Sequence, residues 1–157
     1  MLSEVPSIRP AAPADEAFLT GLLGRLADFE VPSWRTAAEI ADADGPILLD
    51  ALHRPQGDTV ILVAEKPAGT PAGYAFVSTK VDYFTRVRHA HVEVLAVSPE
   101  VEGRGVGRAL LEAAEQWAAA RGDVQITLNV WWQNTRARSV YDRLGYQPET
   151  IHLRKNL

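Results

Sequence analysis

The chain has 157 residues, of which 46% are hydrophobic, and it carries a formal net charge of −4 with no cysteine. This length and apolar content predict one globular domain over residues 1–157. The lack of cysteine excludes disulfides, thiolate metal sites and a cysteine nucleophile, and the acidic balance disfavours a general nucleic-acid binder.

The first half of the chain predicts one short strand and two helices. Apolar residues alternate over residues 5–9, which indicates a strand. They then recur at three- and four-residue steps over residues 15–26 and again over residues 36–52, which indicates two helices. Gly45-Pro46 interrupts the second helical pattern, and residues 28–35 form the connecting loop.

The second half predicts three strands followed by an alternation of helix and strand. The strand segments are rich in Val, Ile and aromatic residues, whereas the helical segments place their apolar residues on one stripe. This order implies an α/β or α+β fold whose mixed sheet is mostly antiparallel, with one parallel crossover. In chain order the segments are the strands 59–65, 72–79 and 90–97, the helix 105–121, the strand 124–130, the helix 135–144 and the strand 146–153.

A glycine-rich turn, Gly103-Arg104-Gly105-Val106-Gly107, joins the third of these strands to the long helix. Glycine lets the main chain approach a ligand closely, and the first turn of a helix offers unpaired N–H groups, so the turn is typical of a phosphate site. Arg104 and Arg108 add positive charge there. The alternative is that the glycines only build a tight connection. The Lys-Ser/Thr of a P-loop and the Gly-x-Gly-x-x-Gly spacing of a Rossmann turn are both missing.

Leu95-Ala96-Val97-Ser98-Pro99, followed by Gly105 and Gly107, resembles the GNAT superfamily of acyl-CoA-dependent N-acyltransferases. In that family, main-chain amides of Gln/Arg-x-x-Gly-x-Gly/Ala hold the CoA pyrophosphate. Glu102 stands in the slot usually filled by Gln or Arg. A second register, Arg104-x-x-Gly107-x-Ala109, matches the residue types of the motif, but it lies two residues further from the preceding strand than is usual in the family. We therefore prefer the first register. The resemblance implies an acetyl-CoA site formed by Leu95, Ala96, Val97, Glu102, Gly103, Arg104, Gly105, Val106, Gly107, Arg108 and Asn134.

A second motif supports the resemblance: Asn134, Ala137, Tyr141 and Gly145-Tyr146 match the family's Asn, Ala, Tyr and Gly-Phe/Tyr. Taken alone, Asn134 is a good helix N-cap, and Tyr141 on an apolar stripe is ordinary core. The resemblance implies that Tyr141 protonates the departing thiolate and that Asn134 contacts the CoA chain. It also implies a GNAT-type fold of six or seven strands that splay apart between strands four and five, flanked by four helices.

The amine that attacks a thioester must be neutral, so the site needs a proton acceptor. His91, Glu93 and Leu95 share one strand face by two-residue alternation. Positions 91 and 93 match those where arylalkylamine N-acetyltransferases carry paired histidines. We therefore expect Glu93 to act as the general base, directly or through water, with His91 as partner or alternate. The competing interpretation places both side chains on a half-exposed strand with no catalytic role.

The resemblance implies an acceptor pocket built from the first two helices, their connecting loop and the strand that follows. Its candidate residues are aromatic and suit a cationic or aromatic amine, although they suit a core equally well. The side chains expected to bind the acceptor are Phe29, Trp34, Tyr83 and Trp131, with Glu30, Arg35, Tyr74, Phe84 and Trp132 nearby.

The leading hypothesis is an N-acetyltransferase that moves the acetyl group of acetyl-CoA to a primary amine of a small molecule or peptide through a ternary complex. The alternatives are a non-catalytic acyl-CoA-binding sensor or interaction module and a phosphate-binding nucleotide enzyme. No metal is expected, since the histidines lack the His-x-x-x-His spacing. No apolar run reaches the roughly 20 residues of a membrane helix, and residues 1–6 lack signal-peptide features, so we expect a cytoplasmic protein without nucleic-acid or membrane partners. From the family resemblance we also expect a homodimer.

Overall fold

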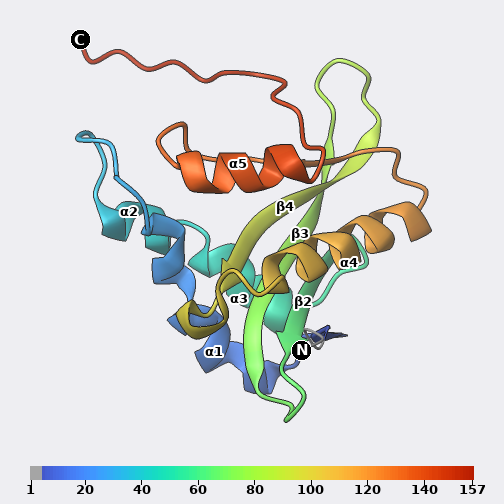
Figure 1. Ribbon diagram of the computed structural model, residues 1–157. Helices are drawn as coiled ribbons and strands as arrows, with labels where there is room; N and C mark the ends of the chain where they lie inside the picture. Colours follow the sequence, from blue (N-terminus) through green and yellow to red (C-terminus); the bar gives the residue numbers. More distant parts are fainter. Residues whose placement is uncertain (1–4) are drawn as a thin grey trace.

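The computed structural model describes residues 5–157. Its centre is a five-stranded mixed sheet in the order β1-β2-β3-β4-β5 (Figure 1). The first four strands pair antiparallel with their neighbours, and β5 pairs parallel with β4. The expected order of pairing, including the single parallel crossover, is therefore confirmed. The strands are β1 (Ser7–Pro10), β2 (Thr59–Glu65), β3 (Pro71–Val81), β4 (Arg88–Val97) and β5 (Ile126–Leu128).

The helices fall into the four segments that the periodicity predicts. The first segment is a short α-helix continued by a 3-10 helix, and the second is divided at Gly45-Pro46, because proline is best accommodated in the first turn of a new helix. The last two segments are uninterrupted. The bounds are α1 (Glu16–Gly21), the 3-10 helix η2 (Leu23–Ala27), α2 (Ala37–Asp42), α3 (Gly45–His53), α4 (Val106–Ala120) and α5 (Thr135–Arg143).

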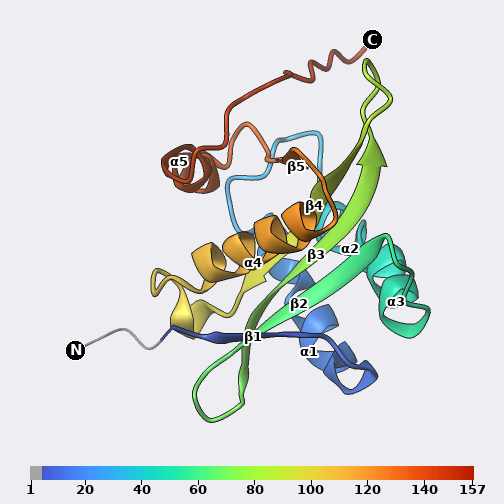
Figure 2. The ribbon, with the colours of Figure 1, turned by 90° about the vertical axis from the view of Figure 1, so that its right-hand side faces the viewer.

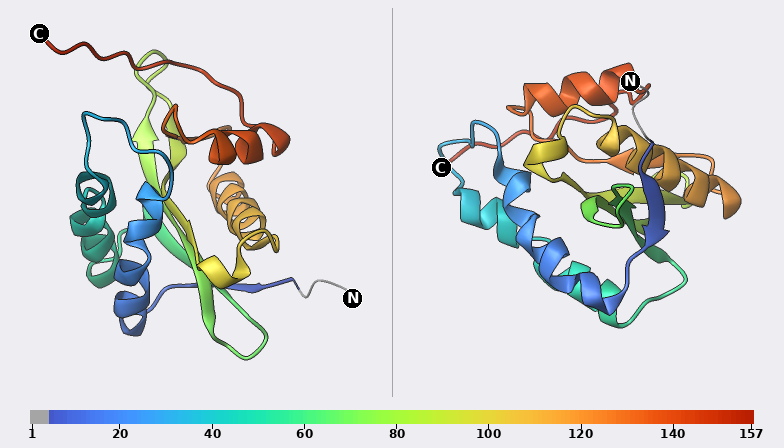
Figure 3. Two further views of the ribbon diagram at one scale, coloured as in Figure 1. Left: turned by 60° about the vertical axis from the view of Figure 1, so that its left-hand side comes forward. Right: turned by 60° about the horizontal axis from the view of Figure 1, so that its bottom comes forward.

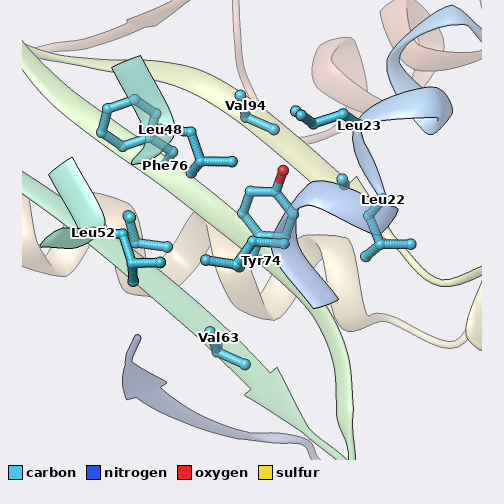
Figure 4. Packing of buried hydrophobic residues seen from close by; sticks show 11 residues of the cluster. Leu22, Leu23, Leu48, Leu52, Val63, Tyr74, Phe76 and Val94 are labelled. Atoms are coloured by element: carbon cyan, nitrogen blue, oxygen red, sulfur yellow. The ribbon is translucent and has the colours of Figure 1, made fainter. Parts of the chain in front are cut away.

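The sheet is packed on both faces, with α1 and α3 on one side and α4 on the other (Figures 2 and 3). On the first face, Tyr74 and Phe76 of β3 pack with Leu48 of α3 (Figure 4). On the second face, Ala75 and Val77, also on β3, pack with the apolar stripe of α4. This alternation along one strand is what a sheet buried on both sides requires.

The ladder between β4 and β5 is short. It comprises three pairs, Ala90 with Ile126, His91 with Thr127 and Val92 with Leu128. Beyond Val92 the two strands part, whereas β4 stays paired with β3 as far as Val97. The predicted splay between the fourth and fifth strands therefore lies at Val92 and Leu128.

Two expectations about the end of the sheet are corrected. Within residues 5–157 the sheet has five strands rather than six or seven, and the strand expected over residues 146–153 does not form. Residues 147–157 are exposed and leave the body of the molecule beyond α5 (Figure 1). Pro148 lacks an N–H for a ladder, and β5 offers only three residues as a partner, so local alternation is not sufficient to fix a strand here.

None of the helices within residues 5–157 is long and apolar enough to cross a bilayer. In the same part of the chain, no group of three or more His, Asp or Glu side chains is arranged to hold a metal ion. Residues 1–4, which belong to the segment that was assessed for signal-peptide features, lie outside the residues that the structure describes.

Candidate active site

A cleft of about 580 Å³ opens where β4 and β5 part. One wall is formed by β4 and by the chain leaving β5, and the opposite wall by η2, α2 and the residues that follow it. The N-terminal half of α5 closes one end. The lining residues are Arg25, Leu26, Arg35, Glu39, Ile40, Ala43, Asp44, His91, Val92, Glu93, Leu95, Leu128, Asn129, Val130, Trp131, Asn134, Ala137 and Tyr141.

The glycine-rich turn at the start of α4 presents bare main-chain donors. Gly103 and Gly105 have φ of 75° and 84°, and the left-handed Gly105 is the N-cap of α4. Such angles favour glycine because a Cβ would meet the neighbouring carbonyl. Among the described residues, the N–H groups of residues 105–108 have no main-chain acceptor, since the first hydrogen bond of the helix runs from Ala109 to Gly105. Gly103, Gly105 and Arg108 are exposed, whereas Val106 is buried, so the turn is open to solvent at its first two glycines.

This turn fits a diphosphate by its donors and by its open space. A Cβ at Gly107 would meet only the Val97 side chain, at 3.6 Å, and nothing lies within 4 Å of one at Gly103 or Gly105. Glu102 is the unfavourable charge, but it is already paired with Arg25 at 2.7 Å and with Arg136. Arg104 and Arg108 are exposed beside the turn, and Arg108 pairs with Glu112 on the next turn of α4.

His91 and Glu93 project from β4 beside the splay. The register shift in the β3–β4 ladder pairs Phe76 with Val94 and Val77 with Val92, which leaves Glu93 as an extra, bulged residue. His91 Nε2 lies 3.9 Å from Glu93 Oε2. Both side chains are mostly buried and both line the cleft.

The bulge corrects the expectation that Leu95 shares a face with His91 and Glu93. After an extra residue the alternation shifts by one, so Val94 packs with the α1 and α3 cluster, whereas Leu95 packs with the α4 cluster. Leu95 still reaches the cleft, because the splay uncovers the edge of β4.

The environments of the two side chains set different proton affinities. Burial lowers the pKa of His91 from its ordinary 6.5, although the charge of Glu93 opposes the shift. Burial by itself would raise the pKa of Glu93. The Ser78 hydroxyl donates to Glu93 Oε1 at 2.6 Å and the Lys80 ammonium lies 2.5 Å from the same oxygen, and the net result is a lowered pKa. His91 is therefore neutral near pH 7, while Glu93 is an ion-paired carboxylate and a weak base.

The motif on α5 is arranged as its spacing predicts. Asn134 caps the helix, since its Oδ1 accepts from the N–H of Ala137 at 3.1 Å. About two helical turns after Asn134, Tyr141 lines the cleft, and burial raises the pKa of its hydroxyl. A phenol held neutral in this way is suited to donate a proton.

The profile of the acetyltransferase (GNAT) family matches residues 23–146, which includes the splay, the turn and the α5 motif. The chain belongs to this family. As a GNAT protein it is an N-acetyltransferase, and curated relatives along most of its length carry that activity in their names.

Three similar proteins illustrate the likeness. The aminoglycoside N(6')-acetyltransferase type 1 of Stenotrophomonas maltophilia is 29% identical over 151 residues, which cover 94% of this chain and 90% of the relative. The solved structure of AAC(6')-Iy in complex with the bisubstrate analog CoA-S-monomethyl-acetylneamine has a TM-score of 0.69 at 22% identity, with 97% and 99% of the two chains covered. The BH1408 protein of Bacillus halodurans, in a mutant form, has a TM-score of 0.76 at 19% identity, with 96% and 99% covered. The two structures establish the GNAT fold.

The residues expected to bind the acceptor are only partly brought together in this GNAT protein. Trp131 lines the cleft, and its ring stacks on that of Phe29 with centroids 6.2 Å apart. Trp34 is exposed in the loop before α2, beneath the guanidinium of Arg154. Tyr83 lies with Phe84 in the exposed β3–β4 hairpin and is not a lining residue.

Of the other aromatic candidates, Tyr74 is fully enclosed in the core, and its hydroxyl has no hydrogen-bond partner among residues 5–157. Trp132 is exposed and stacks with Arg138. The two residues begin a turn that is closed by the Asn134 N–H donating to the Trp131 carbonyl at 2.9 Å, and only Trp131 of this pair lines the cleft.

Sequence reasoning missed several lining residues, above all Arg25, Glu39 and Asp44. Burial raises the pKa of Asp44, and the charge of Glu93 adds to that shift. The carboxyls of Asp44 and Glu93 thus influence each other although 49 positions separate them in the chain. No local pattern indicates this proximity, because residues 36–52 have the apolar spacing of ordinary amphipathic helices.

Proposed function

We propose that the chain transfers the acetyl group of acetyl-CoA to a primary amine of a small molecule, by direct attack within a ternary complex in the cleft between β4 and β5. The observation that carries this proposal is the meeting of a neutral His91 and a protonated Tyr141 at one cleft, whose wall residue Arg25 pairs with Glu102 beside the bare amides at the start of α4. Acetyl-CoA supplies an acetyl group already activated as a thioester. The chain has to hold it, orient the amine and move two protons.

The donor would be held along the splay. The amides of residues 105–108 face the diphosphate, with Gly103, Arg104 and Arg108 beside it, and the amide of Asn134 contacts the pantetheine arm. The uncovered edge of β4 at Leu95, Ala96 and Val97 provides main-chain groups for the same arm, apart from the Val97 carbonyl, which accepts from Arg25 Nε at 3.2 Å. It also provides a donor for the acetyl oxygen. This role of the turn requires no metal ion.

His91 would accept the proton of the attacking amine. Its Nδ1 lies 2.7 Å from the hydroxyl of Thr127, which can itself donate to the carbonyl of Ala90 at 3.5 Å. With Nδ1–H donating to that hydroxyl, Nε2 carries the free lone pair and faces Glu93 and the cleft. Glu93 then stabilises the imidazolium that forms, so its role is electrostatic and its proton affinity can remain low.

The atoms balance in one turnover. The amine nitrogen bonds to the acetyl carbon and loses a proton to His91 Nε2, while the carbon–sulfur bond breaks and the sulfur receives a proton from the Tyr141 hydroxyl. The products are the N-acetyl amine and free CoA. His91 then releases the proton that it gained to solvent, and Tyr141 takes one up from solvent.

For the acceptor we propose a cationic amine of the aminoglycoside type. The support is the name of the relative that aligns over 94% of this chain and the three carboxylates of the cleft, Glu39, Asp44 and Glu93. Carboxylates in a partly enclosed cleft favour a ligand with several ammonium groups. The ring pair of Phe29 and Trp131 adds an apolar surface at the same cleft.

Thiol release from acetyl-CoA, measured with panels of aminoglycosides, polyamines, aryl amines and peptides, tests the proposal. We expect release with an aminoglycoside and an N-acetyl product by mass spectrometry. Binding of CoA without release for any amine would instead indicate a sensor. Competition of ATP or NAD with CoA in a thermal-shift experiment would indicate a nucleotide enzyme.

The homodimer expected from the resemblance stays a proposal. Within residues 5–157, β5 has no strand on its outer side, and residues 147–157 expose Ile151 and Leu153. A free strand edge and an exposed extended segment are surfaces that another copy can cover. Sedimentation of the full chain and of a variant ending at Tyr146 tests this, and a monomeric full chain would contradict it.

A further inference from the structure

Glu102, at the position where the family pattern has Gln or Arg, joins two arginines from distant parts of the chain. Its Oε2 accepts from Arg25 Nη2 at 2.7 Å, and its Oε1 contacts Arg136 Nη2. Arg25 belongs to η2 and Arg136 to the first turn of α5. One carboxylate therefore gathers two guanidinium groups beside the proposed diphosphate turn.

The two arginines are held very differently. Arg25 is anchored by three acceptors, because it also donates from Nε to the carbonyl of Val97 at 3.2 Å and contacts Asp28. Its side chain is 23% exposed. The Arg136 side chain is 70% exposed, and Glu102 is the one ion-pair partner it has within the described residues. Arg25 is thus a fixed part of the cleft wall, whereas Arg136 has no second ion pair or side-chain hydrogen bond within residues 5–157 to hold it in place.

The Glu102–Arg136 contact also joins the two halves of the proposed cofactor site. Glu102 lies three residues before Gly105, the N-cap of α4, and Arg136 lies two residues after Asn134, the N-cap of α5. The contact therefore connects the start of one helix with the start of the other. A cofactor that touches both the residue 105–108 amides and Asn134 has to lie beside it.

We propose that Arg136 is a cofactor-binding residue, kept at the mouth of the site by Glu102 and transferred to the diphosphate of CoA when the cofactor binds. This rests on the proposed function. A diphosphate carries more negative charge than a carboxylate and offers an arginine a bidentate set of oxygens, so the exchange favours the phosphate. Glu102 keeps its bond to Arg25 and is not left as an unpaired charge. In this arrangement Glu102 is a positioning residue, and Arg136 supplies the cation that the turn itself lacks at position 102.

Calorimetric titration of the full chain with CoA, and separately with pantetheine, which has no diphosphate, tests the assignment. Arg136→Ala is expected to weaken CoA binding about tenfold, the order of one exposed charge-assisted contact, and to leave pantetheine binding unchanged. Arg143→Ala is the matched control, because Arg143 lies on the same helix, is exposed and, in the described part of the chain, makes one side-chain hydrogen bond, to the Ser139 hydroxyl at 3.4 Å. It should bind both ligands as the natural chain does. The difference between Arg136→Ala and the natural chain should shrink as salt is raised.

Glu102→Gln separates positioning from direct contact. Because the carboxylate competes with the diphosphate for Arg136, its neutralisation should leave CoA binding as tight as before or tighter. A loss of CoA affinity in Glu102→Gln as large as that in Arg136→Ala would overturn the proposal, since Glu102 would then contact the cofactor itself. An Arg136→Ala variant that is folded by thermal melting and binds CoA normally would also overturn it. If the natural chain failed to bind CoA at all, the proposed function itself would be contradicted. The failure of the proposed function is therefore distinguishable from the failure of the Arg136 assignment.

Discussion

The two halves of the proposed site differ in the chemical groups that they use. The cofactor half, residues 98–108 with the start of α4, lies outside the lining of the cleft and relies on main-chain donors, and glycines occupy its two left-handed positions. The acceptor half relies on side chains, among them His91, Glu93 and Asp44, that come from separate elements. A main-chain site tolerates changes of side chain as long as the backbone can adopt its angles, whereas a side-chain site changes its chemistry with each substitution. We therefore expect single substitutions to have the largest effects on turnover in the side-chain half and moderate effects on cofactor affinity in the main-chain half.

The largest effect is expected at His91. His91→Gln removes the proton acceptor and should lower kcat/KM about 1000-fold, within the range of general base catalysis, with CoA affinity unchanged. Because the pKa of His91 is lowered from 6.5, the acid limb of the pH profile in the natural enzyme should lie below pH 6.5. Steady-state kinetics from pH 5 to 9 measures both. The companion variant Glu93→Gln should cost only about tenfold, since Glu93 acts on the imidazolium by charge. A larger loss in Glu93→Gln than in His91→Gln would make Glu93 the base.

Tyr141→Phe should lower kcat about 100-fold, because the departing sulfur loses its proton donor, while the ring keeps its packing. Tyr146→Phe is the control on the neighbouring ring, whose centroid lies 5.9 Å away. It removes the hydrogen bond from the Tyr146 hydroxyl to Glu115 at 3.0 Å and should cost about 1 kcal/mol of stability with kcat unchanged. Kinetics and thermal unfolding of both variants decide between a chemical and a packing role. Equal kcat losses in the two would remove Tyr141 from the chemistry.

Gly105→Ala tests the main-chain half. The substitution strains a residue at φ 84° and should cost about 1 kcal/mol of stability and weaken CoA binding about tenfold, while kcat at saturating CoA changes little. Gly57→Ala is the control, since Gly57 lies in an exposed loop with ordinary φ and open space around it. Chemical unfolding and calorimetry measure the two quantities. Unchanged CoA affinity in a strained Gly105→Ala variant would contradict the use of these amides.

Asp44→Asn should raise the KM for a polycationic amine about fivefold, with kcat and CoA affinity unchanged, because a partly buried carboxylate is lost from the acceptor wall. Asp50→Asn is matched to it, since Asp50 is exposed on α3, lies outside this cleft and pairs with Arg54. Kinetics with a monoamine and a polyamine separate the effects. A KM that rises equally for both amines would contradict a role in recognising the additional charge.

The smallest effect concerns stability against pH. With its pKa lowered in the folded state, His91 is protonated more readily in the unfolded chain. The stability associated with its neutral form is therefore complete above pH 6.5 and is lost as the pH falls from 6.5 towards the lowered value. Denaturant unfolding at several pH values should show this decline, and His91→Gln should reduce the slope. An equal slope in both proteins would place the titration elsewhere.

The sequence by itself determined the elements whose signal is local. The Gly103–Gly107 turn, the Asn134 cap and the long amphipathic helix form where the spacing predicts them, because torsional freedom, capping and a 3.6-residue stripe act within a few residues. The antiparallel pairing of the first strands and the parallel crossover also followed, since the connections between elements are short or pass through one helix.

Only the tertiary structure decided the features that depend on contacts between distant segments. The bulge at Glu93 arises from pairing with β3, and it moved Leu95 to the other face. Whether residues 146–153 form a strand depends on a neighbouring strand edge with which to pair. The ion pairs that join Arg25, Glu102 and Arg136 connect residues more than 100 positions apart in the chain. Such contacts produce no periodic pattern in the sequence, because each residue pairs with a partner that comes near only after the sheet has formed.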